Sequence, residues 1–246
     1  MKSFEAGNIL IRLAQTEKDY KEIYRLRYFD LILNYNQDQV NHEEIDKDEY
    51  DDVCDHLVAI DKVKNEVIGT YRLIKRSHIK DLGRYLTENE FDISKLNGYE
   101  VLEVGRAVVK EEYRDGAAIN LLWKGVIRYA IEDGIDFMIG TASFHGIDPY
   151  EYKDTLSYLY YHYLSPEDIR CTVRKTTFSK LDLLKEEEIN EENAKKKMPP
   201  LVKGYLRLNA TVGDGAYLDI PFNSLDVLIV LKISDINPRY LKRYLD

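Results

Sequence analysis

The 246-residue sequence is poor in cysteine, in long apolar runs and in positive charge. Its two cysteines, Cys54 and Cys171, cannot build a disulfide framework, and neither lies in a spacing typical of a metal site. No apolar run approaches the roughly eighteen residues of a membrane-spanning helix, and the N-terminal residues lack the apolar core of a signal peptide. We therefore expect a reduced, cytoplasmic location and no metal.

The net charge of −9 argues against nucleic acid as the main partner, because phosphate binding needs a basic surface. The composition, 44% hydrophobic and 32% charged, is that of an ordinary globular protein. One basic run, Lys195–Lys197 with Lys203 and Arg207 close behind, departs from the acidic average. Such a run is most often a solvated surface segment, and docking of an acidic partner or of anionic lipid is the alternative.

Hydrophobic periodicity predicts a mixed α/β sheet in a single domain, residues 1–246, with one helix crossing after the opening strand. A polar segment at 179–200 is expected to form a helix and an exposed loop. Helices are predicted at 17–34, 116–132 and 154–164. Strands are predicted at 8–15, 56–61, 66–75, 101–109, 136–144, 204–212 and 226–234.

The turn Arg114-Asp115-Gly116-Ala117-Ala118 joins an alternating strand to an apolar helix. A helix N-terminus offers unpaired N–H groups and a positive dipole end, which together suit a phosphate. The small side chains of Gly116, Ala117 and Ala118 would let a ligand approach, and Arg114 could add a charge. The alternative is a plain helix start packed tightly on a strand. The turn matches neither a Walker loop nor a dinucleotide fingerprint.

Other polar residues have a functional and an ordinary interpretation. Glu103 and Arg106 lead into that turn as an active-site pair or as a structural ion pair. His145 follows a buried strand and could shuttle a proton or simply be hydrogen-bonded. The acidic segment 37–56 could bind a cation or be a solvated loop with helix caps. The helix at 154–164 could line an apolar slot with its tyrosines, or belong to the core: Tyr158, Tyr160, Tyr161 and Tyr163.

Strand, "EEYRDGAA", helix and "FMIGTASFHG" together resemble the acetyl-CoA-binding core of the GNAT acyltransferases. Arg114 matches the first position of their turn [QR]-x-x-G-x-[GA], whereas Ala117 and Ile119 stand where small or glycine residues are usual. Five further blocks resemble the ornithine N-acyltransferases that make lyso-ornithine lipid, often labelled hemolysin-like: "DEYDDVCDHLVAID", "VIGTYRL", "LEVGRAVVKEEYRDGAAINLLWKGV", "GTASFHG" and "MPPLVKGYLRLNATVGDGAYLDIPFNSLDVLIVL". A more distant likeness is to acyl-homoserine-lactone synthases.

This resemblance implies a GNAT-like α/β fold, with a mixed, mostly antiparallel sheet flanked by helices. It implies an N-acyltransferase that moves a (3-hydroxy)fatty acyl group from acyl carrier protein to the α-amine of ornithine or a related amino acid. The product would be a lyso-aminolipid of ornithine lipid biosynthesis. No cofactor is expected beyond the donor, which is acyl carrier protein or, alternatively, acyl-CoA. The amino-acid acceptor is the other partner, and peripheral contact with the inner membrane is a further expectation.

The resemblance also implies roles for individual residues. Glu103 would be the base that activates the amine, with Arg106 beside it. The acceptor would be held by Asp48, Asp51, Arg72 and His145. The donor pantetheine or phosphate would lie against Val108, Arg114, Gly116, Ala117, Ala118 and Ser143. Candidate docking charges for the acidic carrier are Arg114, Lys124, Arg128 and Lys195–Lys197.

Two other functions stay open at this point. One is an acyl-homoserine-lactone-type synthase that uses S-adenosylmethionine as the acceptor. The other is a non-catalytic protein that binds acyl groups or the carrier.

Overall fold

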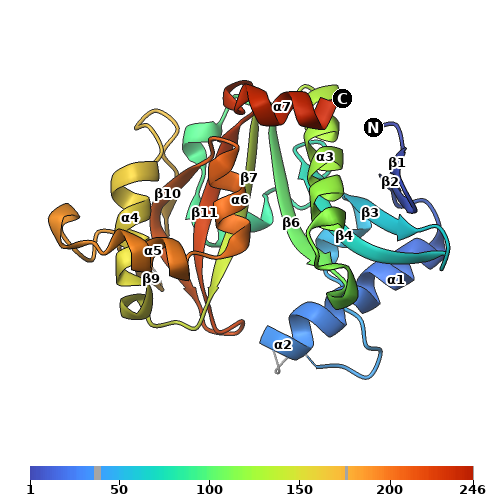
Figure 1. Cartoon of the computed structure of the whole chain (residues 1–246), viewed down its shortest axis with the longest axis horizontal. Helices are drawn as coiled ribbons and strands as arrows, with labels where there is room; N and C mark the ends of the chain where they lie inside the picture. The colour runs from blue at the N-terminus through green and yellow to red at the C-terminus, as the bar shows by residue number, and fades with distance from the viewer. Residues whose placement is uncertain (36–39, 175–176, 246) are drawn as a thin grey trace. The chain divides into compact units, whose positions relative to one another are not determined.

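The computed structural model describes residues 1–35, 40–174 and 177–245. The chain divides into two compact units (Figure 1). The first unit contains Met1–Arg84, Leu102–Ile135 and Leu241–Asp246, and the second contains Tyr85–Val101 and Asp136–Tyr240. The prediction that all 246 residues form one domain stays a prediction.

The first unit is built on an antiparallel sheet in the order β1-β2-β3-β4-β6. β4 is buried along almost its whole length, as expected for a central strand covered on both faces. The strands are β1 Phe4–Ala6, β2 Ile9–Leu13, β3 Asp55–Asp61, β4 Glu66–Lys75 and β6 Val101–Val109.

Two long helices cover opposite faces of this sheet. α1 (Glu17–Arg27) packs on β4 and shares a core with Val58. α3 (Ala117–Glu132) packs on β2, β3 and β4, and its Gly125 lies directly against Leu57. Because neighbouring strand residues point to opposite faces, Leu57 and Val58 show that α1 and α3 lie on different sides.

The predicted helix at 17–34 forms, but its geometry changes along its length. Thr16 and Asp19 make a capping box at its start, and Asp19 also binds Arg12 through two hydrogen bonds of 2.8 and 2.9 Å. After α1 the chain continues as a π-helical turn, η1 (Tyr28–Ile32), and then as α2 (Leu33–Tyr35). π-Turns inside helices often occur at functional sites.

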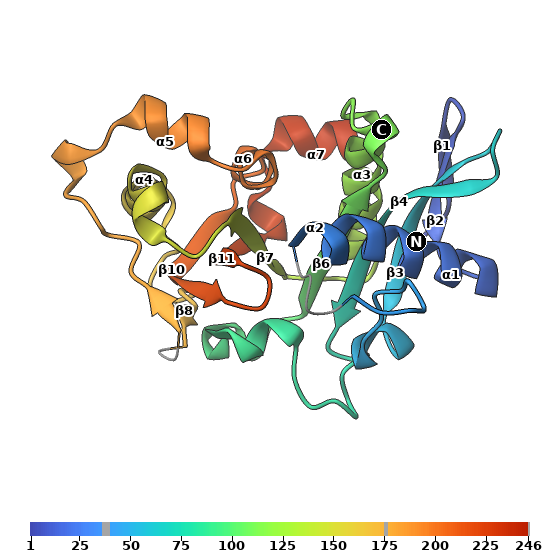
Figure 2. The same ribbon diagram turned by 90° about the horizontal axis from the view of Figure 1, so that it is seen from below.

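The second unit has a sheet in the order β7-β11-β10-β8-β5, with β9 also pairing with β10 (Figure 2). All pairs are antiparallel except β10 with β8. The strands are β5 Phe91–Asp92, β7 Phe137–His145, β8 Thr172–Val173, β9 Phe178–Ser179, β10 Thr211–Asp219 and β11 Ser224–Lys232.

Helix α4 packs on β10, α5 packs on α4, and α6 packs on β11. The helices are α4 Lys153–Tyr163, α5 Glu191–Lys197, α6 Pro200–Arg207 and, after β11, α7 Pro238–Leu245. Short 3-10 turns lie at Glu49–Asp52 (η3), Leu86–Asn89 (η4), Ser94–Leu96 (η5), Glu111–Tyr113 (η6), Pro149–Tyr152 (η7), Glu186–Glu188 (η8) and Ile233–Asp235 (η9).

The predicted strand at 204–212 is wrong, because its first half belongs to α6 and the strand itself runs over Thr211–Asp219. Pro200 starts the helix at its first turn, where a missing N–H costs nothing. Gly215 lies within β10 at a φ of +90°, which residues with a side chain rarely adopt. A Cβ at this position would also collide with Val173. The glycine therefore lies where the register between β10 and β11 shifts.

The predicted fold class is confirmed: the sheet is mixed, mostly antiparallel and flanked by helices. Within the described ranges, every helix is too short or too polar to cross a membrane.

Candidate active site

Six charged side chains in the first unit form a closed ring of ion pairs. Each arginine in the ring contacts two aspartates, and each aspartate contacts two arginines. In order around the ring, the residues are Arg27, Asp46, Arg106, Asp48, Arg72 and Asp51. Three positive and three negative charges balance, so the cluster is formally neutral.

One half of the ring is fully buried. Asp51 accepts two hydrogen bonds from Arg27, at 2.7 and 3.0 Å, and a longer one of 3.3 Å from Arg72. The side chains of Arg27 and Asp51 have no exposed surface, and that of Arg72 is 1% exposed. The Nε of Arg72 is a buried donor without a hydrogen-bond partner among the described residues. Such donors are rare in folded proteins, so this one marks a candidate functional group.

The other half of the ring reaches the surface. Arg106 donates from Nε to Asp46 at 3.0 Å and from Nη2 to Asp48 at 3.5 Å. The side chains of Arg106 and Asp48 are 22% and 23% exposed. Asp48 also accepts two hydrogen bonds of 2.7 Å from Arg72. A guanidinium and a carboxylate therefore face solvent side by side, backed by the buried pairs.

The ring sets the ionisation of its buried members. Burial by itself would raise the pKa of Asp51, but the hydrogen bonds and charge of Arg27 and the charge of Arg72 hold it well below its usual range. Burial likewise opposes the charge of Arg72, yet Asp48 and Asp51 raise its pKa above the ordinary value. Both groups are therefore ionised at neutral pH, although they are excluded from water.

The backbone brings these residues together from four separate segments. Arg27 ends α1, and Arg72 lies on β4 opposite His56 of β3. Asp48 caps the turn η3, where its N–H also donates to Asp51 at 2.9 Å. The fourth segment is β6, which carries Arg106. Within the acidic segment, residues 46–51 are thus held partly by their own capping box and partly by arginines from the sheet and helix, whereas residues 37–39 of that segment lie outside the described residues.

Glu103 is buried, 5% exposed, on the same face of the sheet as Arg72. The register shows this directly, because Glu103 pairs with Ile74, two residues along β4 from Arg72. The ring of Tyr50 lies 5.7 Å from the guanidinium of Arg72, and burial together with the charge of Glu103 raises the pKa of this tyrosine. Glu103 is therefore a carboxylate with little access to water, on the face of the sheet that carries Arg72 of the charged ring.

β6 has a bulge next to Arg106. Thr70 pairs with Val108 and Arg72 with Gly105, so two residues of β6 stand opposite one residue of β4. Arg106 takes a left-handed φ of 51°, which is costly for a residue with a side chain. Strained bulges of this kind are common beside active sites, where they redirect backbone or side-chain groups.

The turn predicted to bind the donor is compact and partly self-paired. Gly116 caps α3 with a φ of +96°, and the N–H of Ala117 donates to Asp115 at 2.9 Å. Arg114 donates from Nε to the carbonyl of Val109 at 2.8 Å, and its Nη2 is ion-paired with Asp30. Val108 and Ala118 are buried, and Val108 belongs to the core that α1 covers.

Ser143 and His145 lie on β7 of the second unit, and both are exposed. Ser143 is paired with Asp226 of β11 and hydrogen-bonds to its carboxylate. The carbonyl of His145 accepts a hydrogen bond of 2.8 Å from Tyr152. Their assigned parts in substrate and donor binding stay predictions.

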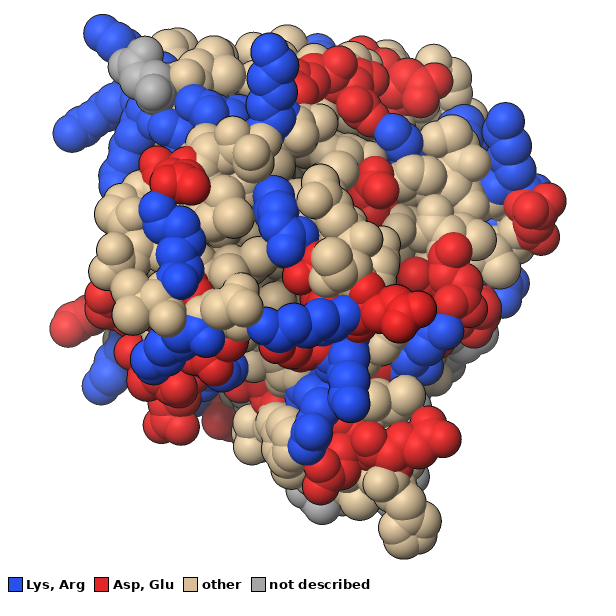
Figure 3. Space-filling view, turned by 90° about the vertical axis from the view of Figure 1, so that its right-hand side faces the viewer, with Lys and Arg blue, Asp and Glu red and all other residues tan. Residues whose placement is uncertain are grey.

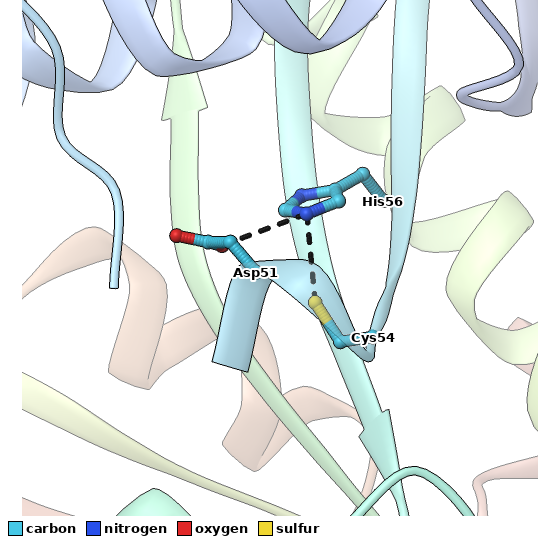
Figure 4. Close-up of side chains that lie close together, drawn as sticks. All are labelled: Asp51, Cys54 and His56. Atoms are coloured by element: carbon cyan, nitrogen blue, oxygen red, sulfur yellow. Dashed lines mark hydrogen bonds and ion pairs between the residues drawn. The ribbon is translucent and has the colours of Figure 1, made fainter. Parts of the chain in front are cut away.

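Among the described residues, two groups of side chains bring potential metal ligands close to one another. In the first, His56 Nε2 lies 3.5 Å from both Asp51 Oδ1 and Cys54 Sγ (Figure 4). Burial raises the pKa of Cys54 to about 12 and lowers that of His56 to about 4, so both are neutral at pH 7. The thiol is protonated and the carboxylate is occupied by arginines, so this group suits a metal poorly.

The second group lies in the second unit: Glu90, Asp219 and Asp226. Asp226 is 4% exposed and accepts a hydrogen bond of 3.0 Å from Ser224. Burial raises the pKa of Asp226 to about 6. Carboxylates are ligands for hard cations, but acidic groups also cluster without one.

The basic side chains considered for docking are largely engaged within their own unit. Lys124 and Arg128 lie over the ring of Phe4, at 5.5 and 4.7 Å, and Arg128 also donates to the carbonyls of Tyr244 and Leu245. Acidic and basic side chains are interspersed on the face that Figure 3 shows.

The lysine run and the tyrosine-rich helix also contact each other. Lys195 lies 5.2 Å from the ring of Tyr158, and Lys197 lies 5.8 Å from that of Tyr152. These aromatic rings therefore have neighbours inside the second unit. Docking of the carrier by the lysines and lining of an acyl slot by the tyrosines both stay predictions.

Arg27 and Asp46 are ring members that the sequence interpretation missed. A signal for Arg27 was present, because a charged residue falls on the apolar stripe of the helix at 17–34. A charge placed where a helix is buried needs a partner. Asp46 carried no such signal, since it is one of many acidic residues in its segment.

Residues 24–124 match the family model of the acetyltransferase (GNAT) domain. The structure is similar to those of two acyl-homoserine lactone synthases: BjaI, described as CoA-dependent (TM-score 0.54, 13% identity, 95% of this chain and 86% of that one), and LasI (TM-score 0.54, 12% identity, 93% and 91%). The matched residues and these two structures show a fold of the GNAT class.

The sequence relatives narrow the class. The L-ornithine N(alpha)-acyltransferase of Rhodobacter capsulatus is 34% identical over 244 residues, covering 95% of this chain and 93% of that protein. The protein of the same name from Rhizobium meliloti is 34% identical over 250 residues, covering 97% and 84%. The chain belongs to the family of the L-ornithine N(alpha)-acyltransferases, which confirms the resemblance found in the sequence.

Proposed function

We propose that this protein transfers a long, 3-hydroxylated acyl group from acyl carrier protein to the α-amine of ornithine, giving a lyso-aminolipid. Ornithine as the acceptor is supported by the relatives, which are named L-ornithine N(alpha)-acyltransferases. The observation that carries the proposal is the open half of the charged ring, where Arg106 and Asp48 face solvent together. A guanidinium suits the carboxylate of an amino acid, and a carboxylate suits its side-chain ammonium.

The buried half of the ring has a different part in this proposal. Arg72 and Asp51 are almost fully buried and are ion-paired with each other at 3.3 Å, so direct contact with the acceptor would require the ring to open. They hold Asp48 and Arg106 at a fixed separation instead. Ordering the binding groups before the acceptor arrives reduces the entropy lost on binding.

Glu103 removes the proton from the α-ammonium, directly or through a water, because only the neutral amine is a nucleophile. The amine then attacks the thioester carbonyl, and backbone N–H groups near the β6 bulge stabilise the oxyanion. This attack forms the C–N bond, and collapse of the tetrahedral intermediate then re-forms the carbonyl and breaks the C–S bond. The nitrogen gives up its second proton to the departing pantetheine thiolate, and Glu103 passes the first proton to water.

A mass-spectrometric assay tests the proposal. Purified protein is incubated with 3-hydroxypalmitoyl carrier protein and ornithine, lysine, glycine or S-adenosylmethionine. We expect an N-acyl product with ornithine, at least about a hundredfold less of it with Glu103→Gln, and no loss with the exposed control Glu100→Gln. Product with S-adenosylmethionine alone would support a lactone-type synthase instead, and equal turnover by both variants would remove Glu103 from the chemistry.

A further inference from the structure

Asp30 is a charged residue that the mechanism above does not use. It lies in the π-helical turn η1, which continues α1, and its side chain is 22% exposed. Its carboxylate is ion-paired with Arg114, in the turn before α3, eighty-four positions along the chain. Arg114 is thus held at both ends of its guanidinium, by Asp30 and by the carbonyl of Val109.

Asp30 and Arg114 border a hollow of about 550 Å³ in the first unit. Five acidic and three basic side chains line it, with an apolar floor that includes Leu26 and Val67. The other two basic residues are also paired: Arg25 with Glu44 at 2.7 Å, and Lys110 with Glu66 at 2.8 Å.

The acidic excess of this hollow is not neutralised. Glu111 and Glu112 line it next to Arg114, and neither has an ion-pair partner within the described part of the chain. The five acidic and three basic side chains that line the hollow therefore sum to a formal charge of −2, although an arginine stands at its edge. A negative potential repels anionic ligands in proportion to their charge.

We propose that Asp30 is a specificity-determining residue for the acyl donor. By pairing with Arg114 it removes a cation from the approach to the α3 turn. This disfavours the three phosphate groups of acyl-CoA relative to the single phosphodiester of a carrier-linked donor, whose acidic protein surface docks through basic side chains other than Arg114. The inference rests on the proposed function, because it takes the Arg114–Ala118 turn as the place where the donor phosphate binds.

Substitution of Asp30 separates this selectivity from general charge effects. In Asp30→Asn, we expect kcat/KM for 3-hydroxypalmitoyl-CoA to rise about tenfold, while kcat/KM for the carrier-linked donor changes by less than about twofold. The matched control is Glu112→Gln, which removes the same charge from the same hollow without releasing Arg114, and its donor ratio should change by less than about twofold. The double variant Asp30→Asn/Arg114→Gln should lose the gain.

Two outcomes would overturn the inference. If Asp30→Asn lowers the use of both donors equally, Asp30 only orients Arg114. If Glu112→Gln gives the same gain as Asp30→Asn, the effect is one of bulk charge and not of this ion pair. The circular dichroism melting curve of each variant shows whether it is folded as the wild type is.

A binding measurement keeps this test independent of the proposed reaction. Titration calorimetry with free CoA should show tighter binding to Asp30→Asn than to the wild type, and the difference should shrink as salt is raised. If the wild type transfers no acyl group from either donor, the proposed function fails. Equal CoA affinities for the wild type and Asp30→Asn would overturn the role of Asp30 by itself.

Discussion

Two buried aspartates, one in each unit, respond to burial in opposite ways. Counting backbone and side chain together, Asp51 and Asp226 are each 4% exposed. The pKa of Asp51 is far below its usual range, because burial is outweighed by two arginines. The pKa of Asp226 is raised to about 6 by burial, and its hydroxyl partners Ser143 and Ser224 offset this only in part. Burial makes a charge costly, and the partner decides whether the charge persists.

The two aspartates therefore affect stability in opposite directions as pH changes. A group with a lowered folded pKa stabilises the protein above its unfolded pKa, and this stabilisation is lost as pH falls through the folded value. A group with a raised folded pKa stabilises below its unfolded pKa, and the stabilisation is lost as pH rises through the folded value. Asp51 belongs to the first case and Asp226 to the second.

The largest expected effect is that of Asp51→Asn. Removing this charge leaves Arg27 and Arg72 buried with an incomplete set of counter-charges, so the free energy of unfolding should fall by about 3–5 kcal/mol. Urea denaturation at pH 7 measures it. Asp52→Asn, at a neighbouring exposed ion pair with Lys47, should cost less than about 1 kcal/mol. Equal losses for the two variants would contradict the compensated ring.

Asp226→Asn should have the opposite sign. Above pH 7 the wild type pays to keep an ionised Asp226 buried, so the variant should be more stable by up to about 3 kcal/mol. This gain should vanish between about pH 6 and pH 4, as the wild-type carboxyl becomes protonated. Urea denaturation across that range provides the curve. A variant with the wild-type pH dependence would show that Asp226 is not the titrating group.

Asp19→Asn tests the same compensation of burial by positive charge at a site with one arginine, Arg12, in place of two. Asp19 binds Arg12 and accepts N–H bonds from Gln15 and Thr16, and these lower its pKa despite burial. We expect a loss of about 2 kcal/mol in the free energy of unfolding at pH 7, which shrinks as pH falls. A loss that is unchanged at pH 2 would assign the effect to packing and not to charge.

Arg106→Gln should have its main effect on the acceptor. Because Arg106 lies on the exposed half of the ring, the KM for ornithine should rise about tenfold, while the loss of stability stays below that of Asp51→Asn. Steady-state kinetics and urea denaturation, done on the same preparation, separate the two. A stability loss as large as that of Asp51→Asn would make Arg106 as structural as Arg27.

Local sequence patterns predicted much of the fold. The strand at 66–75 was recovered from its short apolar and β-branched run, and the helix at 116–132 from its apolar period and the glycine at its start. The error at 204–212 arose where competing local signals overlap, since α6 ends only a few residues before β10 begins. Periodicity over so short a stretch does not distinguish a helix end from a strand start.

The candidate site was predictable only in part. Asp48, Asp51, Arg72 and Arg106 were found through the resemblance, whereas their closure into a ring depends on Arg27 and Asp46. The ion pairs of Arg27 and Asp46 join segments that are far apart in sequence. Only the pairing of β3, β4 and β6 under α1 brings these segments together. The ion pair of Asp30 with Arg114 likewise had no local signal.

The sequence by itself determined the periodicities, the helix caps, the small residues of the α3 turn and membership of an acyltransferase family. Those features depend on residues close together in the chain or on blocks of residues in a given order. The tertiary structure alone decided which aspartates are compensated, which half of the ring faces solvent and which acid holds Arg114. Electrostatic energies depend on distance and on exclusion of water, and both are set only when distant segments pack.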